Sequence, residues 1–454
     1  MKVLSAYSVK IKEYRHIFKD SIRIYRSAVD FFIDVCLKEW ELISVPDRLT
    51  ERKTLVESVT VSTKEHPDVQ YPFGMENHGF YKFPCYLRRA AIAEAIGKVS
   101  SYKSNLTNWE ESDPRTRGEK PSYPKAGYCY PAFYRDNMFI REDDYAAQLK
   151  VFRNNTWDWI TVQLRKSDVD YIIHHCGRMK ECAPTLMKRG RQWYLDFPFE
   201  EKSKLKETPI MEQLILSVDL GINSSATCSV LKSDGTVLGR HFLKLPKEYD
   251  SLNHKIDHIK RAQRHGSRKV SNLWAYAKGV NDGIAVKTAK FIMDMAILYD
   301  VDCIVFEHLD IGKKKRGFRK QRLALWKARY VQSMVTHKAH VNGMHVSHIN
   351  AWGTSKLAFD GSGAVLRGNK STKTSNNYSL CEFQNGKIYN CDLSASYNIG
   401  ARYFVREILK TLPARERQRI EAKVPGCAKR STCTLATLIS LNGELGSAEL
   451  GIAV

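Results

Sequence analysis

Residues 214–240, LILSVDLGINSSATCSVLKSDGTVLGR, decide the fold that this sequence predicts. Two apolar runs precede a Ser-Asp-Gly turn and a third run from Thr236, which is the pattern of three consecutive strands. Gly235 favours the turn because glycine takes the positive φ that tight hairpins need. The first strand ends on Asp219, and a buried carboxylate is unfavourable without a hydrogen-bond partner or a cation. Asp219 is therefore the first candidate functional residue.

Two classes of fold begin with three strands and an Asp at the end of the first one. In actin-like kinases and ATPases an Asp-Leu-Gly hairpin contacts nucleotide phosphate. In RNase H-like nucleases an Asp on the first of three strands binds a divalent metal ion. Asp219 and the Leu-Gly pair that follows it fit both classes, so the rest of the chain has to distinguish them.

Composition favours a polyanionic partner. The chain has 454 residues, a formal net charge of +23 and 11% aromatic residues, which suits nucleic acid better than a membrane. No segment approaches the roughly 18 apolar residues of a membrane-spanning helix, and the N-terminus has no signal-peptide pattern. The 11 cysteines are scattered without a disulfide spacing. We expect a cytoplasmic protein of several domains.

The first 200 residues combine strands and helices. Residues 1–12 alternate as a half-buried strand does, and the apolar spacing over 16–40 and 84–102 predicts two helices. Residues 157–164 and 185–197 again have strand patterns, the latter as a hairpin. Together with 1–12 they predict one antiparallel barrel that the helices interrupt. The charged segment 200–209 reads as a linker.

Residues 120–139 alternate aromatic residues with Lys and Arg around three prolines. Tyr123, Tyr128 and Tyr130 are candidates for stacking on the bases of single-stranded or splayed nucleic acid. Packing of a proline-rich loop onto the neighbouring helices explains the same aromatic residues, so both interpretations stay open.

Two later segments are strongly basic. Residues 252–272 hold several cations against the single acid Asp257, and no Asp or Glu occurs between Asp310 and Asp360. Such charge favours phosphate contact, although a solvated basic face is the ordinary explanation for any one residue. The candidate nucleic-acid contacts are Lys255, Lys260, Arg261, Arg264, Arg268, Lys313, Lys314, Lys315, Arg316 and Arg319.

Two more carboxylates occupy positions like that of Asp219. The apolar run 301–307 predicts a buried strand that ends on Glu307, and Asp392 opens a helix that runs to about 409. Taken alone, a helix N-cap is the commoner explanation of Asp392. In an RNase H-like domain, however, this order of elements brings all three acids to one end of the sheet. Three hard oxygen ligands suit two Mg²⁺ ions about 3.5–4 Å apart, which catalyse phosphodiester hydrolysis.

Three motifs give the chain a family resemblance. VDLGIN (218–223), VFEHLD (305–310) and CDLSASYNIGAR (391–402) resemble the RuvC motifs of the transposon-encoded TnpB proteins and of the compact type V CRISPR effectors. The resemblance implies that Asp219, Glu307 and Asp392 are catalytic and bind two Mg²⁺ ions, with Mn²⁺ as an alternative. Asn398 stands where the family has an asparagine after the last Asp.

The resemblance also implies an activity and partners. The expected activity is RNA-guided DNA endonuclease cleavage by a protein of the bacterial or archaeal cytosol, associated with a transposon or a CRISPR locus. The expected partners are a guide RNA and double-stranded target DNA with a short flanking motif. No membrane is expected, and a monomer or a homodimer on one guide fits a protein of this size.

The resemblance further implies a domain order. An antiparallel β-barrel (wedge) is interrupted by a helical recognition domain and followed by an RNase H-like (RuvC) nuclease domain with a degenerate zinc-ribbon insertion. The expected boundaries are 1–15 and 146–208 for the wedge, 16–145 for the recognition domain, 209–350 and 391–412 for RuvC with a basic bridge-like helix at about 251–272, 351–390 for the insertion, and 413–454 for a tail without an assigned role.

The insertion departs from the family pattern. Where the family carries two Cys-x-x-Cys knuckles, this chain has Ala358 and Gly361, and then Cys381 and Gln384, with Cys391 directly before Asp392. We therefore expect no structural zinc. The insertion is expected to pack through apolar residues instead: Trp352, Leu357, Phe359, Tyr378 and Phe383.

Three alternatives remain. An actin-like ATPase or sugar kinase needs a second phosphate loop, which residues 359–363 imitate, but the basic charge and the third acid disfavour it. A nuclease-inactive guided nucleic-acid binder on the same fold is the second. A DDE transposase is the third, although its usual helix-turn-helix is not evident.

Overall fold

The computed structural model describes residues 1–13, 16–74, 80, 82–115, 117–134, 136–221, 224–267, 270–309, 326–371, 374 and 379–450. The chain divides into two compact units, one formed by Lys2–Glu201 and the other by Lys202–Val454 with Met1. The division falls inside the predicted linker 200–209. The finer domain boundaries stay predictions.

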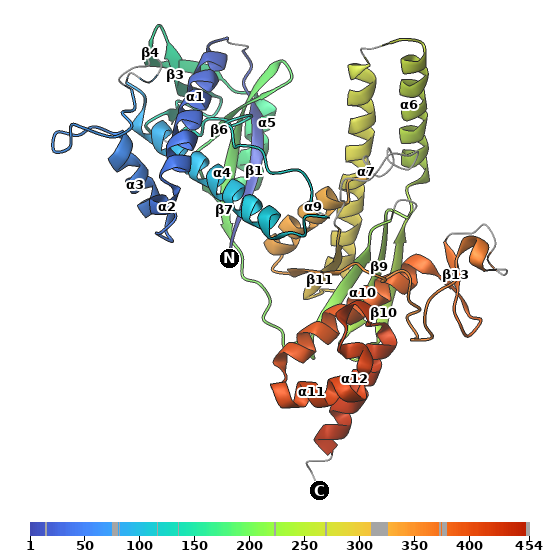
Figure 1. Ribbon diagram of the computed structural model, residues 1–454. Coiled ribbons are helices and arrows are strands. Elements are labelled where there is room, and N and C mark those ends of the chain that lie inside the picture. Colours follow the sequence, from blue (N-terminus) through green and yellow to red (C-terminus); the bar gives the residue numbers. More distant parts are fainter. Residues whose placement is uncertain are drawn as a thin grey trace. The chain divides into compact units, whose positions relative to one another are not determined.

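The N-terminal unit combines a helical layer with two small sheets (Figure 1). One sheet has the order β1-β7-β5, with β6 also paired to β7, and the other has the order β2-β3-β4. Its elements are β1 Lys2–Lys10, α1 Ile17–Lys38, α2 Trp40–Ile43, α3 Leu49–Thr60, α4 Cys85–Glu111, β2 Phe139–Arg141, β3 Ala146–Arg153, β4 Thr156–Gln163, α5 Lys166–Cys176, β5 Lys180–Glu181, β6 Thr185–Arg189 and β7 Gln192–Lys202.

One hydrophobic core joins these elements. Phe18, Phe32 and Trp193 are fully buried in it, and Phe18 meets Trp193 edge to face at 5.2 Å between ring centroids. The predicted strands 1–12 and 157–164, and the hairpin at 185–197, are present. Among the described residues the two sheets meet through single bridges, such as that between Ile11 and Leu164. The single closed barrel therefore stays a prediction.

The C-terminal unit is built on a five-stranded sheet of order β10-β9-β8-β11-β12 (Figure 1). The first three strands are antiparallel neighbours, as the opening hairpin predicts, and β11 is parallel to both β8 and β12. The strands are β8 Leu214–Asp219, β9 Ala226–Lys232, β10 Val237–Leu243, β11 Cys303–His308 and β12 His345–Asn350.

Helices cover both faces of this sheet. The helices α6 Pro246–Arg264 and α7 Ser271–Leu298 lie side by side as a long pair (Figure 1), and α7 packs with α9 Ala328–Val341 over one face. The other face carries α10 Cys391–Thr411, which is buried along most of its length. The remaining elements are η1 Gly368–Lys370, β13 Leu380–Glu382, β14 Ile388–Asn390, α11 Ala414–Lys423, η2 Pro425–Cys427, η3 Arg430–Thr432 and α12 Leu435–Leu450.

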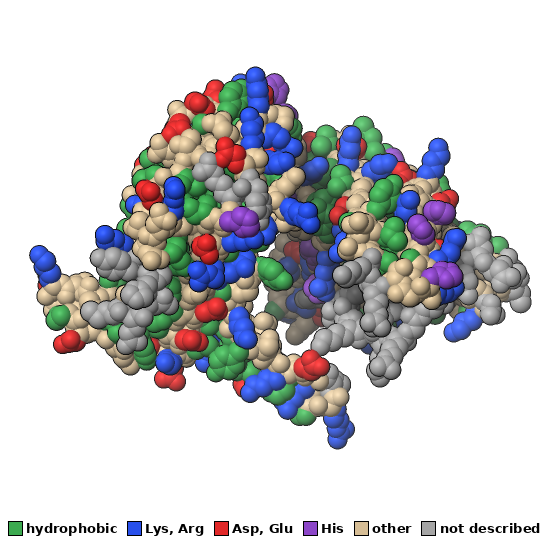
Figure 2. Space-filling view, turned by 90° about the horizontal axis from the view of Figure 1, so that it is seen from above, with side chains coloured by type: hydrophobic (Ala, Val, Ile, Leu, Met, Phe, Trp, Pro, Cys, Tyr) green, Lys and Arg blue, Asp and Glu red, His purple; other side chains and the backbone are tan. Residues whose placement is uncertain are grey.

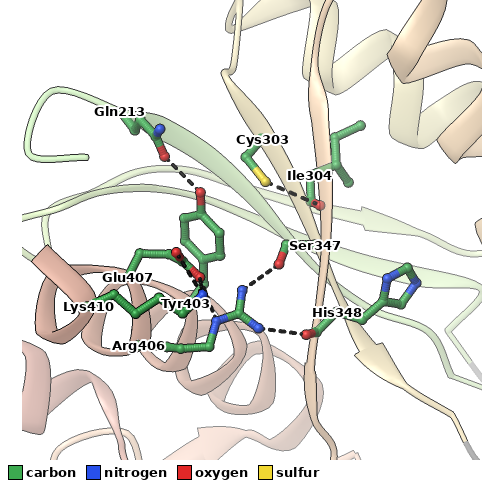
Figure 3. A network of polar contacts seen from close by, with 9 residues as sticks. All are labelled: Gln213, Cys303, Ile304, Ser347, His348, Tyr403, Arg406, Glu407 and Lys410. Atoms are coloured by element: carbon green, nitrogen blue, oxygen red, sulfur yellow. Dashed lines mark hydrogen bonds and ion pairs between the residues drawn. The ribbon is translucent and has the colours of Figure 1, made fainter. Parts of the chain in front are cut away.

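Polar contacts fix the second half of α10 over the sheet (Figure 3). The Tyr403 hydroxyl donates to Gln213 Oε1 at 2.8 Å, next to the start of β8. Arg406 donates to the His348 carbonyl at 2.9 Å and to Ser347 Oγ at 2.5 Å, both on β12. The helix is thus tied to both sides of the parallel strands, which fixes where its first turn lies.

Small residues let α10 approach the sheet closely. A Cβ added at Gly400 would lie 3.2 Å from Ser217 Oγ and from both methyl groups of Leu231. Nearby, the hydroxyls of Ser229 and Ser396 hydrogen bond across the interface at 2.5 Å. In the described part of the chain, no helix is both long and apolar enough to cross a membrane.

Candidate active site

Asp219 and Glu307 end two adjacent parallel strands. Val218 on β8 pairs with Phe306 on β11, so the next residue of each strand is a carboxylate. Side chains alternate between the faces of a strand, and Leu216 and Val218 pack on the α7 side. Asp219 therefore shares the α10 side of the sheet with Ile215 and Ser217, as Glu307 does with Cys303 and Val305.

Asp392 completes the group from above the sheet. It is the second residue of α10, whose N-cap is Asn390, and the Asn390 side chain accepts a hydrogen bond from the Leu393 N–H at 2.9 Å. Capping is therefore done by Asn390, and the N-cap explanation of Asp392 is wrong. The side chain of Ser224, two residues before β9, instead lowers the pKa of Asp392.

The three carboxylates interact electrostatically. Burial raises the pKa of Asp219 well above its ordinary value, and repulsion from Glu307 and Asp392 raises it further. Burial likewise raises the pKa of Glu307 and that of Asp392. Each side chain nevertheless retains partial exposure to solvent. Negative charge is thus concentrated at one end of the sheet, where a bound cation would relieve the repulsion.

Arg367 is the cation that sequence reasoning missed. It lowers the pKa of Asp219 and of Asp392, against the larger effect of burial. Its Nη2 donates to the Ser355 carbonyl at 2.5 Å, whereas its Nε is buried without a hydrogen-bond partner. Arg367 lies in the insertion, 25 positions before Asp392, and no local pattern marks it out.

The donor set fits divalent cations by charge and atom type, since all three side chains offer hard oxygen ligands. In the described part of the chain, however, no group of three or more His, Cys, Asp or Glu residues is arranged to hold a metal ion. Glu307 and Asp392 are both close enough to Asp219 to raise its pKa.

The predicted basic contacts are only partly described. Arg261 and Arg264 are exposed on α6, Lys255 lies 4.5 Å from the Tyr276 ring centroid, and Lys260 pairs with Asp257 at 3.1 Å. Figure 2 shows Lys and Arg side chains spread more densely than Asp and Glu over the face that it draws. The remaining predicted contacts lie outside the described residues: Arg268, Lys313, Lys314, Lys315, Arg316 and Arg319.

The aromatic segment supports parts of both of its interpretations. Tyr123 and Tyr128 are 67% and 89% exposed, whereas Phe133 is fully buried in the N-terminal core. Arg26 lies 5.9 Å from the Tyr128 ring centroid and 5.1 Å from that of Tyr130, and donates to the Cys129 carbonyl. The exposed tyrosines therefore remain candidates for stacking, while the loop is anchored by packing.

The insertion 351–390 has a small core of its own. Ala358, Cys381, Phe383 and Cys391 are buried there, with Phe359 packed against them. Trp352 does not contribute as predicted, because it is 59% exposed, and Tyr378 lies outside the described residues. The positions that replace the first zinc knuckle thus pack or turn, Ala358 in the core and Gly361 at φ +78°.

Comparisons with known proteins define the class of the chain and then its family. The chain is similar to the TnpB-like protein aq_aa05 of Aquifex aeolicus, with 24% identity over 236 residues that cover 47% of this chain and 74% of that protein. A family model named Aq_aa04 matches residues 5–153. The uncharacterized protein aq_aa04 of the same organism is 33% identical over 138 residues, covering 27% of this chain and 76% of that protein. The chain therefore belongs to the Aq_aa04 family.

Among solved structures, the chain is similar to that of a Cas12f1–sgRNA–target DNA complex. The sequence identity is 14% and the TM-score is 0.49, over 84% of this chain and 81% of that one.

Proposed function

We propose that this protein is an RNA-guided DNA endonuclease that hydrolyses phosphodiester bonds with two divalent metal ions. Asp219, Glu307 and Asp392 would hold the ions, which are Mg²⁺ in the first place. When bound, the ions would activate water and stabilise the leaving 3′ oxygen. The single observation that carries the proposal is that Asp219 at one strand end is close enough to be repelled by Glu307 at the neighbouring strand end and by Asp392 at a helix start.

The residues around the carboxylates support this chemistry. The Thr354 hydroxyl donates a hydrogen bond to Glu307, which restricts how that carboxylate turns, and Ser224 lowers the pKa of Asp392. Arg367 brings a guanidinium with a spare Nε donor to the same place, and Lys244 also lowers the pKa of Asp392. A DNA phosphate entering the site would meet these two cations beside the metal ions.

A guide RNA and a DNA target are proposed from two observations. The relatives that share the sequence are TnpB-like proteins. The net charge of +23 gives the surface a strong attraction for nucleic acid. The exposed Arg261 and Arg264 on α6 would contact the phosphate backbone without reading sequence.

The kinase alternative has less support. A phosphate loop needs backbone N–H groups that are free to bind the ligand. In the segment 358–363 the N–H groups of Ala358 and Gly361 bond to carbonyls within the segment, and that of Ser362 bonds to the Asp360 carboxylate. These donors are already satisfied, so the segment is poorly suited to hold nucleotide phosphate.

The proposal is tested by expressing the protein with its flanking genomic DNA and sequencing the RNA that purifies with it. We expect an abundant RNA with a constant scaffold and a variable end. The complex should then cleave DNA that matches the variable end when Mg²⁺ is present and not when EDTA replaces it. Protein that carries only random cellular RNA, or that cleaves without regard to the variable end, would contradict the guided activity.

A further inference from the structure

The segment that follows α10 belongs to the core of the C-terminal unit. Leu435, Leu438 and Leu441 of α12 are buried in the same cluster as the sheet residues Ile215 and Val305. At the start of α12, the Ala436 N–H donates to the Phe359 carbonyl of the insertion at 2.9 Å. The last part of the chain is therefore packed against both the sheet-covering helix and the insertion.

Arg402 on α10 is bonded entirely to backbone carbonyls. The side chain is 4% exposed and donates to the carbonyls of Asn350 and Trp352, both at 2.8 Å. It also donates to those of Ser431 at 2.5 Å and Cys433 at 3.1 Å. One buried guanidinium thus joins the segment leaving β12 to the segment entering α12.

Asn398 makes a second link one helical turn earlier. It is fully buried, and its Nδ2 donates to the carbonyls of Thr354 at 3.0 Å and Leu357 at 2.9 Å. Its Oδ1 accepts from the Leu435 N–H at 3.3 Å. Both donors and the acceptor of this amide are used, and they join the same two segments that Arg402 joins.

The segment that these side chains hold reaches the carboxylates. Thr354 is 2% exposed, and its hydroxyl donates to Glu307 Oε1 as well as approaching the Ala351 carbonyl at 3.2 Å. The position of the Thr354 hydroxyl depends on its own backbone, which Asn398 fixes. A continuous set of hydrogen bonds therefore runs from α12 through Asn398 and Thr354 to Glu307.

We propose that Asn398 and Arg402, braced by the segment 431–441, are positioning residues that set the orientation of the Glu307 carboxylate for metal binding. The proposal rests on the proposed function, since it takes Glu307 as a metal ligand. It gives a role to the C-terminal part of the chain, which would complete the active site without contacting substrate. Outer hydrogen-bond partners of this kind typically change metal affinity or activity by about 10–100-fold.

The test measures Mn²⁺ binding by electron paramagnetic resonance on the full-length protein. Thr354→Val removes the hydroxyl at constant volume and shape, and Asn398→Ala removes the amide. Thr354→Ser restores the hydroxyl. Thr288→Val is the matched control, because Thr288 is also 2% exposed but its hydroxyl bonds only to the Ile284 carbonyl of its own helix.

We expect Thr354→Val and Asn398→Ala to weaken Mn²⁺ binding about tenfold or more, with Thr354→Ser close to wild type and Thr288→Val unchanged. If Thr354→Val and Asn398→Ala lower only the melting temperature, as Thr288→Val does, and leave Mn²⁺ binding intact, the positioning role is wrong.

Glu307→Gln separates the proposed metal site from the proposed positioning role. Unchanged Mn²⁺ binding in Glu307→Gln would refute the metal site itself, whereas weakened binding in Glu307→Gln alone would refute only the positioning role.

Discussion

The two faces of the five-stranded sheet are made by alternating residues of the same strands, yet they differ in chemistry. Toward α7 and α9 the strands present Leu216, Val218 and Phe306, all buried and apolar. Toward α10 they also present buried apolar residues, Ile215 and Val305 among them. This face differs in carrying Ser217, which a hydrogen bond satisfies, and the carboxylates of Asp219 and Glu307 at its strand ends. A shift of strand register by one residue would exchange the two faces.

The difference shows how the fold supports a charged site. Apolar contacts on the α7 side stabilise the sheet through burial alone, so they do not depend on the charged groups on the α10 side. The α10 face has hydroxyls and Gly400 where the helix approaches, and its strands β8 and β11 end in carboxylates. Both faces stabilise the sheet through buried apolar residues, but the carboxylates are confined to the α10 face. The following predictions test that separation.

The largest expected effect is on activity when a carboxylate is removed from the α10 face. Asp219→Ala, Glu307→Ala and Asp392→Ala should each reduce DNA cleavage by more than about a hundredfold, since even outer-shell partners of metal ligands reach that range. Binding of RNA and DNA should change little, because it depends on the distributed basic surface. Cleavage and filter-binding assays on the same preparations measure both. Equal loss of binding in all three variants would indicate a structural role instead.

On the opposite face, Phe306→Ala should change stability and leave the chemistry intact. Phe306 is fully buried, so the variant should lower the free energy of unfolding by about 3–5 kcal/mol. Urea denaturation measures the loss, and Mn²⁺ binding by the folded variant should equal that of wild type. Weakened Mn²⁺ binding at urea concentrations where the variant remains folded would show that the faces are not separate.

A pH-dependent effect should come from Asp219 on the α10 face. Because the pKa of Asp219 is raised in the folded protein, ionisation of Asp219 favours the unfolded state. In EDTA, stability should therefore fall as pH rises from the ordinary carboxyl pKa through the raised folded value. Asp219→Asn should reduce this fall and raise the melting temperature at neutral pH. Identical pH profiles of melting temperature for wild type and Asp219→Asn would contradict the electrostatic account.

The smallest effect is expected from the basic helix α6, which lies apart from the carboxylates in sequence. Replacing Lys260, Arg261 and Arg264 together by glutamine should reduce the dependence of nucleic-acid affinity on salt by about one counterion per lost phosphate contact. Affinity measured at several salt concentrations gives the slope. A slope equal to that of wild type would mean that α6 contacts no phosphate.

The sequence predicts those parts of the fold that depend on local pattern. The strands β8, β9 and β11 follow from apolar runs, and the ends of β8 and β11 on acids follow from the same runs. The first half of α7 is less evident from local pattern, because Gly279 and Gly283 weaken the helical signal around them. In the tail, the spacing of Leu435, Leu438 and Leu441 by three residues was a signal for α12 that was overlooked.

Much of the site's surroundings could not be predicted in this way. Arg367 approaches Asp219 across 148 positions of sequence, and Thr354 reaches Glu307 across 47. Such contacts depend on the tertiary packing of the insertion, which no local sequence pattern predicts. Trp352 is a second example. It was expected to pack in the insertion but is 59% exposed, because aromatic character alone does not determine which neighbour covers a side chain.

The most direct test of the central claim is a crystal structure of the protein soaked in Mn²⁺, examined by anomalous diffraction. The account predicts two manganese peaks about 3.5–4 Å apart, with oxygen ligands from Asp219, Glu307 and Asp392. Manganese absent from these carboxylates, at a concentration that supports DNA cleavage, would contradict the account.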